Sequence, residues 1–379
     1  MVELQTQLNA IDAATLTPLV RLVTARDGSE VVDWQLQALH GGWEASSSLY
    51  RVAGRARDGA ATIPWSLVLK VMRASPERED PQHWNYWKRE FLAYHSGLLD
   101  TLPGGLYAPA CFGAIEPTED TAWLWLEELV NCAGSPWPVS AYGQAARHLG
   151  SFNGAYLTGL PLPGQAWLRV DWLRSYVEDY APAVARLPQV LNHPLVRRLV
   201  SRPSASAFIR LLEERDTFLR ALDGLPQTLC HRDAWRPNLF MVQAADGQAQ
   251  TVAVDWAFVG IGAVGQELAP LIVYNDQSPS AREDVEALAV EGYVQGLRDA
   301  GWHADPWMVR LGYTAAAALI YGLAGLGWGL GLYLDESQHA WVEESGGRPI
   351  DEGLEDYGVV LDFILTRAEE ARHLMRTVR

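Results

Sequence analysis

Cysteine is scarce in this sequence, and its spacing suggests no cross-linked or metal-bound framework. Cys111, Cys132 and Cys230 lie far apart in a chain of 379 residues, without a Cys-x-x-Cys pair. An odd, scattered set argues against a disulfide scaffold and against a structural zinc site. The first residues also lack the basic and then apolar layout of a secretory signal. Both observations favour a cytoplasmic protein.

Basic residues are also in short supply. The chain has 30 Lys and Arg against 46 Asp and Glu, which gives a formal net charge of -16. Such a charge repels nucleic-acid phosphates and anionic membranes, weakly favours cationic partners, and also serves solubility. A hydrophobic content of 49% with 20% charged residues is typical of a soluble globular chain, here long enough for two lobes. We therefore expect no nucleic-acid or membrane partner, and the oligomeric state stays open.

One long uncharged run stands against that expectation. Residues 311–334 carry no charged side chain, which is long enough to span a bilayer. The run contains six glycines and four consecutive alanines and stands alone, deep in the chain. A buried helix of the C-terminal part is therefore favoured over a membrane span.

Hydrophobic periodicity separates the chain into two parts. The first part reads as short strands with two helices, the first of them capped by Asp12. The predicted elements are a helix over 12–24, strands over 31–39, 49–56 and 65–72, a helix over 84–99 and a strand over 123–130. Residues 131–138, with one glycine and two prolines, are the predicted linker, and the remainder is mostly helical. The expectation is an α+β fold with a nucleotide-binding lobe over 1–130 and a catalytic lobe over 131–379.

The most informative run is His-Arg-Asp-Ala-Trp-Arg-Pro-Asn at residues 231–238, which precedes an apolar strand at 239–242. It places a carboxylate at Asp233 and a carboxamide at Asn238, and Asp255 ends the next β-branched run. Phosphoryl transfer requires positioning and charge neutralisation more than covalent chemistry. One Asp can orient the attacking hydroxyl, while an Asn and a second Asp hold magnesium against nucleotide phosphates. The spacing therefore predicts a phosphoryl-transfer site with Asp233 as its catalytic residue.

A glycine- and serine-rich segment is a second candidate. Gly41 and Gly42, followed by Ser46 and Ser47, lie between two predicted strands. Glycine permits close approach of the backbone to phosphate, and the serines supply hydroxyl and amide donors. A Gly-Gly hairpin is more often an ordinary turn, so this segment carries weight only beside the other candidates.

Lys70 and Glu90 are a third candidate. Lys70 lies in an apolar predicted strand, and Glu90 follows on the next predicted helix. A lysine so placed can reach nucleotide phosphates while an ion pair to the glutamate holds it. A lysine on a strand usually faces water, and the adjacent Lys88 and Arg89 leave the partner of Glu90 open.

The segment Glu127-Glu128-Leu129 follows the last predicted strand of the first lobe. In a two-lobe nucleotide enzyme this segment is the hinge, where an adenine ring bonds to main-chain groups. Glu127 and Leu129 are therefore candidate nucleotide-binding residues. A strand end with two solvated carboxylates is the alternative.

These residues together resemble the aminoglycoside phosphotransferase and choline kinase-like family, small-molecule relatives of the protein kinases. The resemblance extends from the Gly41-Gly42 loop to at least Ala269. Residues 231–238 resemble the family's catalytic loop, H-G-D-x-x-x-x-N, and residues 262–269 resemble its G-D-P-x-x-D-L-A segment.

The resemblance implies a protein kinase-like two-lobe fold and the use of ATP and Mg²⁺. It implies that Asp233 is the catalytic base and that Asn238 and Asp255 are magnesium ligands. Lys70 and Glu90 would form the ion pair that grips the α- and β-phosphates.

Four positions depart from the family pattern. Arg232 stands where the family has Gly, and Trp235 stands in place of a common His. Ala263 and Glu267 replace two Asp residues, and only Glu267 keeps a carboxylate. A protein kinase is disfavoured, because only eleven residues separate Asp255 from Glu267, too few for an activation loop.

The acceptor is not readable from the sequence. Residues 335–356 carry eight acidic side chains against one Arg, which could attract an amine, although a charge run is more often a solvated face. Sixteen tryptophans could supply an aromatic cage or simply core packing. The leading hypothesis is a kinase acting on a hydroxyl of an aminoglycoside, amino alcohol or sugar-like metabolite. The alternative is a nucleotide-binding or regulatory protein of the same fold that has lost catalysis.

Overall fold

The structure is a computed structural model that describes residues 2–39, 47–168, 171–243, 247, 249–278 and 281–377. The chain forms two compact units. Unit 1 comprises residues 1–79, 86–101 and 107–130, and unit 2 comprises residues 80–85, 102–106 and 131–379.

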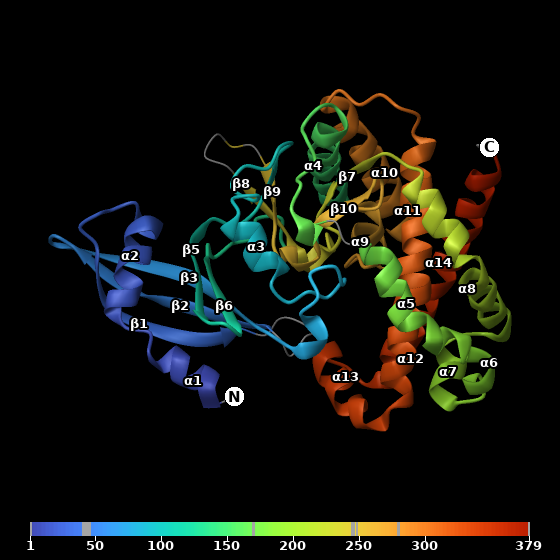
Figure 1. Ribbon diagram of the computed structural model, residues 1–379, viewed down its shortest axis with the longest axis horizontal. Helices are drawn as coiled ribbons and strands as arrows, with labels where there is room; N and C mark the ends of the chain where they lie inside the picture. The colour runs from blue at the N-terminus through green and yellow to red at the C-terminus, as the bar shows by residue number, and fades with distance from the viewer. Residues whose placement is uncertain are drawn as a thin grey trace. The chain divides into compact units, whose positions relative to one another are not determined.

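Unit 1 contains an antiparallel sheet with the strand order β1-β2-β3-β6-β5 (Figure 1). Helices α1 and α2 precede the sheet, and α2 packs against β1, β3 and β5. The core between them contains Leu16 and Val20 of α2 together with Leu67, Leu69 and Trp125 of the sheet. The elements are α1 (Val2–Asn9), α2 (Ala13–Thr24), β1 (Glu30–Leu39), β2 (Ser47–Asp58), β3 (Ala61–Arg73), α3 (Arg89–His95), β5 (Cys111–Thr118) and β6 (Thr121–Leu126), with a 3₁₀ turn at Pro76–Arg78.

The helix predicted over 12–24 and its cap are confirmed, because the Asp12 side chain accepts a hydrogen bond from Thr15 N at 2.8 Å. The helix predicted over 84–99 is wrong in length. Trp87 N bonds to Arg78 O instead of a carbonyl one helical turn back, so α3 begins only at Arg89. Gly97, in the left-handed region at φ 74°, follows the end of α3.

Two strand predictions also need correction. The strand predicted over 123–130 ends at Leu126, because Glu127 N already bonds to Ala110 O outside the sheet. Strand β5 was not predicted, since Gly113 and Pro117 interrupt its alternation and its register shifts after Cys111.

Unit 2 is mostly helical. Its helices are α4 (Val139–Leu157), α5 (Trp172–Ala185), α6 (Leu187–Val190), α7 (Pro194–Leu199), α8 (Arg202–Asp223), α9 (Leu268–Val273), α10 (Arg282–Asp299), α11 (Trp307–Ala317), α12 (Leu326–Leu334), α13 (His339–Gly346) and α14 (Ile350–Thr377), with the π-helix η6 (Ala318–Gly325) between α11 and α12. Short 3₁₀ turns lie at Ala166–Leu168, Arg236–Asn238, Trp256–Phe258 and Glu336–Gln338. Helices α4 and α10 lie side by side (Figure 1). A Cβ atom on Gly296 would lie 2.0 Å from Arg147 O, so glycine permits this close packing.

Short strands connect these helices. Strand β7 (Gln227–Cys230) pairs antiparallel with β10 (Gly260–Ala263). Strand β8 (Leu239–Gln243) pairs antiparallel with β9 (Ala249–Ala253), and β4 (Leu106–Tyr107) lies on the other side of β9. The residues predicted to carry the chemistry lie in the segments between these strands.

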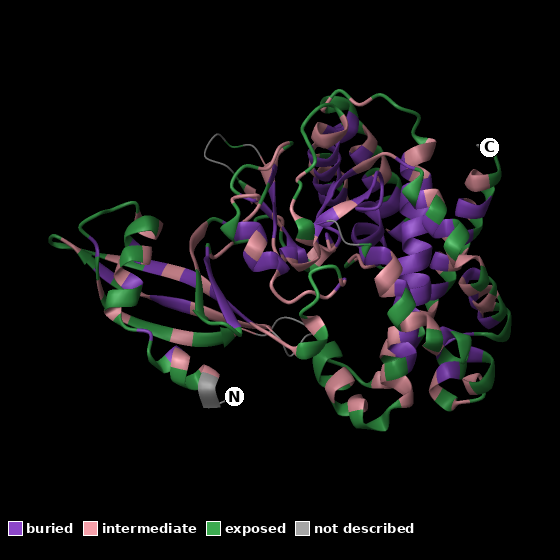
Figure 2. Cartoon of the chain, in the orientation of Figure 1, coloured by how far each residue is buried: buried purple, intermediate pink, exposed green. Residues whose placement is uncertain are grey.

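The uncharged run at 311–334 forms part of a continuous helix from Trp307 to Leu334 that is long and apolar enough to cross a membrane. Within its most apolar window, however, 78% of the residues are buried inside the protein. Figure 2 shows this helix among the most buried parts of unit 2. The segment therefore forms core, as expected, and its composition is weak evidence for a span.

Candidate functional site

The loop from His231 to Asn238 connects β7 to β8 and ends in a 3₁₀ turn. Within it, Asn238 Nδ2 donates to Asp233 Oδ2 at 2.8 Å and to Asp233 O at 3.0 Å. The loop thus folds back on itself over the five residues from Asp233 to Asn238. The amide of Asn238 fixes the Asp233 carboxylate, and Asp233 remains partly exposed while Asn238 is buried.

The same loop is attached to the segment that carries Asp255. Val254 N donates to Asn238 O at 2.9 Å, and the β8–β9 register sets Leu239 opposite Ala253. Asp255 follows directly, in the left-handed region at φ 63°. The structure therefore brings the backbones of Asn238 and Asp255 together, although they lie seventeen residues apart in sequence.

His231 holds these two segments in place. Its Nε2–H donates to Val254 O at 2.9 Å, and its Nδ1 accepts from Asp233 N at 3.2 Å. The ring is fully buried and meets the ring of Trp256 edge-on at 4.5 Å. Sequence reasoning placed His231 in the motif without a role, and the structure gives it a positioning role.

The family pattern has glycine at the position of Arg232, and the backbone conformation of Arg232 gives the reason. Its φ is 69°, a left-handed conformation that costs a residue with a side chain about 1 kcal/mol or more. Arg232 N donates to Glu267 Oε1 at 2.8 Å, and its guanidinium lies beside Gly260 and donates to Ile261 O. Glu267 therefore anchors the backbone of the loop.

Glu267 itself is completely buried. Burial raises the pKa of its carboxyl to about 7, although the hydrogen bond from Arg232 N acts in the opposite direction. This carboxylate lies where the family pattern has an Asp, and its interaction with the loop was not readable from sequence. At Ala263, the other position where the pattern has Asp, the backbone N donates to Gln266 Oε1 at 3.3 Å.

Arg236, next to Trp235, carries a positive charge in the loop, and this charge is paired with an acidic residue. Its Nε lies 3.4 Å from Asp276 Oδ2, and its guanidinium lies 4.5 Å from the ring centroid of Trp137. Asp276 also accepts from Trp137 N and from the Tyr142 hydroxyl. Arg236 therefore attaches the loop to residues at the start of α4.

In unit 1, Lys70 and Glu90 lie together. Lys70 is on the central strand β3, between Leu49 of β2 and Leu124 of β6. Its Nζ lies 2.5 Å from Glu90 Oε2 of α3, and both side chains are buried. The nearby Lys88 instead pairs with Glu116, so Lys88 is not the partner of Glu90.

The other predicted nucleotide-binding residues receive less support. Gly41, Gly42 and Ser46 lie outside the described residues, and Ser47 begins β2 opposite Met72. The Glu127 N–H is already bonded to Ala110 O, so it is not free for a nucleotide base. Within the described parts of the chain, the main chain of Leu129 forms no hydrogen bond.

Among the described residues, no group of three His, Cys, Asp or Glu side chains could hold a metal ion. A magnesium site here would need the amide oxygen of Asn238, the carboxylate of Asp255 and oxygen atoms from the nucleotide. The donor set is compatible with this, because Asn238 uses Nδ2 toward Asp233 and leaves Oδ1 available. Carboxylate and amide oxygens with phosphate are ordinary magnesium ligands.

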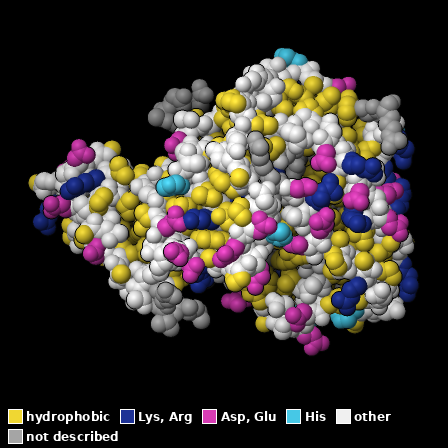
Figure 3. Space-filling view, in the orientation of Figure 1, with side chains coloured by type: hydrophobic (Ala, Val, Ile, Leu, Met, Phe, Trp, Pro, Cys, Tyr) yellow, Lys and Arg dark blue, Asp and Glu magenta, His cyan; other side chains and the backbone are white. Residues whose placement is uncertain are grey.

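The acidic stretch 335–356 is a solvated face. Asp351 and Glu355 pair with Arg198 of α7, and Asp356 pairs with Arg348. Figure 3 shows Asp and Glu side chains interspersed with Lys and Arg side chains over most of the face that it displays. The stretch gives no support to a cation-binding role.

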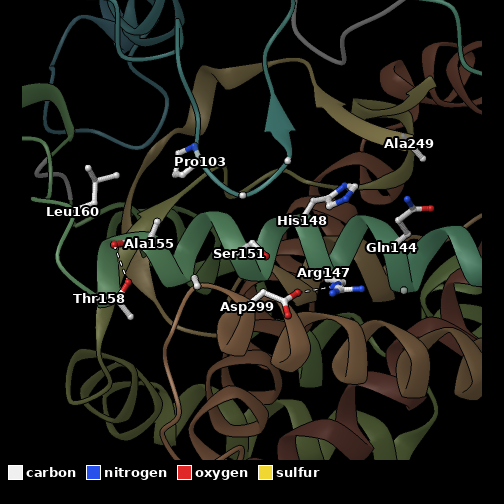
Figure 4. A pocket seen from close by; sticks show the side chains of 14 residues that line it. Pro103, Gln144, Arg147, His148, Ser151, Ala155, Thr158, Leu160, Ala249 and Asp299 are labelled. Carbon is white, nitrogen blue, oxygen red and sulfur yellow. Dashed lines mark hydrogen bonds and ion pairs between the residues drawn. The ribbon is translucent and has the colours of Figure 1, made fainter. Parts of the chain in front are cut away.

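A groove of about 1120 Å³ lies along α4 and α10 of unit 2 (Figure 4). None of the sequence-predicted site residues lines it. Three of its polar side chains already have partners, since Arg147 Nε lies 2.6 Å from Asp299 and His148 Nδ1 lies 2.8 Å from the Thr251 hydroxyl. This groove is therefore separate from the predicted chemistry.

Residues 143–304 match the model of the phosphotransferase enzyme family. No curated protein matches the chain significantly. Among solved structures, a Plasmodium vivax ethanolamine kinase is 11% identical, with a TM-score of 0.52 over 88% of this chain and 82% of that one. The choline kinase of Cryptosporidium parvum Iowa II is 11% identical, with a TM-score of 0.51 over 89% of each chain.

A spectinomycin phosphotransferase solved with ADP and spectinomycin aligns over 95% of this chain and 99% of that one, with 13% identity and a TM-score of 0.49. At such low identity, the likeness to the ethanolamine and choline kinases shows the fold alone. The α+β, protein kinase-like fold predicted from the sequence is confirmed, and so is the resemblance to this family.

Proposed function

Because residues 143–304 match the model of the phosphotransferase enzyme family, we propose that this chain transfers the γ-phosphate of ATP to a hydroxyl group of a small polar molecule, with magnesium as cofactor. One observation supports the proposal more strongly than the others. The Asp233 carboxylate is held by Asn238 Nδ2 at 2.8 Å, in a loop that His231 and Glu267 both fix. A carboxylate so oriented can receive the proton of an acceptor hydroxyl.

The transfer is a single displacement at phosphorus. The acceptor oxygen bonds to the γ-phosphorus as the bond to the β,γ-bridging oxygen breaks, which releases ADP. The hydroxyl proton passes to Asp233. Orientation of Asp233 before the reaction lowers the entropic part of the barrier, since the carboxylate need not be ordered during the step.

Asn238 Oδ1 and the Asp255 carboxylate are the proposed magnesium ligands. When bound, magnesium would neutralise charge on the β- and γ-phosphate oxygens. Asn238 would then serve both its neighbours, with its nitrogen on Asp233 and its oxygen on the metal. This double use explains why an amide, which has both a donor and an acceptor, suits the position.

Lys70 is proposed to contact the α- and β-phosphates and Glu90 to hold it. The ammonium group of a lysine buried beside a glutamate is held in one position, where it can bind a nucleotide phosphate. Leu129, whose main chain is unbonded among the described residues, is the better hinge candidate, whereas Glu127 is disfavoured by its bond to Ala110. Gly41, Gly42, Ser46 and Ser47 remain proposed phosphate contacts.

The alternative of an inactive nucleotide-binding protein rested on Trp235 and Ala263. It is not favoured, because Asn238 holds the Asp233 carboxylate in place despite both departures. The assignment of 1–130 to nucleotide binding and 131–379 to catalysis and acceptor binding is part of the proposal.

The test is a screen of hydroxyl compounds for stimulated ADP release by the full chain. Aminoglycosides, amino alcohols, sugars and hydroxy acids should be included, each with and without Mg²⁺. We expect at least one acceptor to stimulate release only with the metal, and Asp233→Asn, which preserves the acceptor for Asn238, to abolish the stimulation. ATP binding that ignores the metal, with no transfer to any compound, would instead favour the inactive protein.

A further inference from the structure

Two residues of the proposed active site have a strained backbone. Arg232, which directly precedes Asp233, has φ 69°, and Asp255 has φ 63°. Among the residues that the structure describes, Ala25 is the one other non-glycine residue in this left-handed region. Such conformations persist where the surrounding structure holds them, and they cluster at functional sites. The contacts that hold Arg232 therefore bear on the position of Asp233.

The guanidinium of Arg232 is buried between β10 and α5. Its Nη2 donates to Ile261 O of β10, and its Cζ lies 5.5 Å from the ring centroid of Trp172 at the start of α5. Only 5% of Arg232 is exposed. Burial lowers the pKa of Arg232 to about 10, so the side chain stays charged at neutral pH. The residue whose N–H is bonded to Glu267 is thus held at the far end of its side chain as well.

Gly260 provides the space for this guanidinium. A Cβ atom on Gly260 would lie 2.5 Å from Arg232 Nη1 and 2.8 Å from its Cζ, and the three atoms nearest to it all belong to Arg232. The backbone of Gly260 is outside the left-handed region, so an alanine there would meet the clash alone. The absence of a side chain at position 260 is therefore matched to the presence of one at position 232, where the family pattern has glycine.

The guanidinium joins the loop that carries Asp233 to the segment that follows Asp255. That segment continues through a 3₁₀ turn into β10, where Ile261 O accepts from Arg232. Strand β10 begins only five residues after Asp255, so the chain between them has little freedom. The bond from Arg232 thereby limits how far the two segments can separate.

Trp172 contributes to the same link. Its ring faces the guanidinium of Arg232, and its centroid lies 5.6 Å from that of Phe258, which is in the turn after Asp255. A cation on the face of an indole ring is attracted to it. Only 3% of Trp172 is exposed, and α5 begins at this residue. The loop and the turn thus pack on one side chain of α5.

The burial of Arg232 is not fully compensated. Its Nε and Nη1 have no hydrogen-bond partner. A buried donor without a partner is unfavourable, and so is a left-handed backbone in a residue with a side chain. Glycine at this position would avoid both costs. Because proteins keep such costs mainly at functional sites, they favour a role for Arg232 in activity over a role in stability alone.

We infer that Arg232 is a positioning residue of the proposed active site, whose guanidinium fixes the loop of Asp233 relative to the segment of Asp255. The inference rests on the proposed function, because the relative position of these segments matters for transfer only where both carboxylates take part. Arg232 acts through them and touches neither nucleotide nor acceptor. A displacement of about 1 Å in a reacting group can lower turnover about 100-fold, so one such link has a measurable effect.

The first test measures hydrogen exchange of the backbone amides in residues 231–238 and 255–261 of the full chain without ligands. Arg232→Met keeps most of the buried volume but removes the bond to Ile261 O and the charge. Exchange should become faster by about threefold or more in both segments. Arg372→Met is the matched control, because Arg372 of α14 is also 5% exposed but pairs with Glu214 and Glu369. It should leave both segments at the wild-type rate, at a temperature where each variant is folded.

Gly260→Ala tests the same link without a change at Arg232, and it serves also if Arg232→Met does not fold. Its methyl group should displace the guanidinium and speed exchange in both segments. In the Arg232→Gly background the methyl group meets no guanidinium, so Gly260→Ala should add no further effect. An equal effect of Gly260→Ala in both backgrounds would contradict the inference.

Turnover is measured separately, with an acceptor found in the screen or with water as the acceptor of the phosphoryl group. Arg232→Met should lower turnover about tenfold or more and change the KM for ATP by at most about threefold, whereas Arg372→Met should keep wild-type turnover. Unchanged exchange in Arg232→Met, or faster exchange with unchanged turnover, would overturn the inference. Faster exchange in Arg232→Met, with no transfer by the wild type to any compound, would support the link and reject the proposed function.

Discussion

Asn238 donates both to the side chain and to the main chain of Asp233, at 2.8 Å and 3.0 Å. One amide nitrogen thereby fixes the position and the orientation of the carboxylate. The amide oxygen is left for another partner, so the two halves of one side chain can serve proton transfer and metal binding. Two variants of this pair therefore separate the two roles.

Asn238→Ala removes the nitrogen that holds Asp233 and the oxygen proposed to bind magnesium. We expect turnover to fall about 100-fold or more, because both the orientation of the base and a metal ligand are lost. The magnesium concentration for half-maximal rate should also rise. Rates measured over a magnesium titration provide the check.

Asp233→Asn is the control for that titration. It should lower turnover by a comparable or larger factor while leaving the magnesium requirement where it was, since Asp233 is not a proposed ligand. A shift of the magnesium requirement in Asp233→Asn but not in Asn238→Ala would reverse the assignment.

Lys70→Met should weaken ATP binding about tenfold to 100-fold. Hydrogen bonds from a charged donor are worth about 1.5–3 kcal/mol, and Met preserves most of the length of the side chain. Equilibrium titration with ATP measures the effect. Lys88→Met is the matched control, because Lys88 pairs with Glu116 on the surface and should not alter ATP affinity. Equal affinity in the wild type and Lys70→Met would remove Lys70 from the nucleotide site.

The parts of the site that lie within one short motif were readable from sequence. The five-residue interval between Asp233 and Asn238 sets their contact, because the loop between two short strands has little freedom to separate them. The sequence offered Lys70 and Glu90 as a pair while leaving the partner of Glu90 open, and the ion pair forms even though α3 is shorter than expected. The contact within the loop depends on local structure, whereas the ion pair also depends on the packing of α3 against the sheet.

The parts that depend on distant chain segments were not readable. The bond from Trp87 to Arg78 delays the start of α3, and no periodicity reports such a contact. Glu267 reaches the loop from 35 residues away, and its side chain could be judged only as a conservative replacement for Asp.

Glu267 should make the stability of the protein fall as pH rises toward neutrality. Its carboxyl has a pKa of about 7 in the folded chain, raised by burial from an ordinary value of 4.5. Between these values the folded state binds more protons than the unfolded state, so the free energy of unfolding decreases with rising pH, by at most about 1.4 kcal/mol per unit. Below pH 4.5 this contribution is fully retained.

Glu267→Gln keeps an oxygen for Arg232 N and removes the titration. Urea unfolding at pH 5 and pH 8 should therefore show a smaller difference in the variant than in the wild type. The same difference in both proteins would show that Glu267 does not titrate in this range.

The turn before Glu267 requires glycine for two separate reasons. Gly265 has φ +86°, and a Cβ atom there would lie 2.3 Å from Val309 O of α11. Gly347 has φ +64° but open space around a Cβ atom. Gly347→Ala should therefore cost about 1 kcal/mol of stability, the strain of the left-handed backbone alone. Gly265→Ala should cost about 3 kcal/mol, because the clash adds to that strain.

The two alanine variants should differ in activity as well. In Gly265→Ala, the backbone of the turn must shift to relieve the clash. Glu267 lies two residues further on and accepts from Arg232 N, so the shift would also displace the loop that holds Asp233. We expect turnover to fall in Gly265→Ala and to stay at the wild-type level in Gly347→Ala, measured at a temperature where both are folded. Normal turnover in a destabilised Gly265→Ala would show that the loop keeps its geometry without the anchor at Glu267.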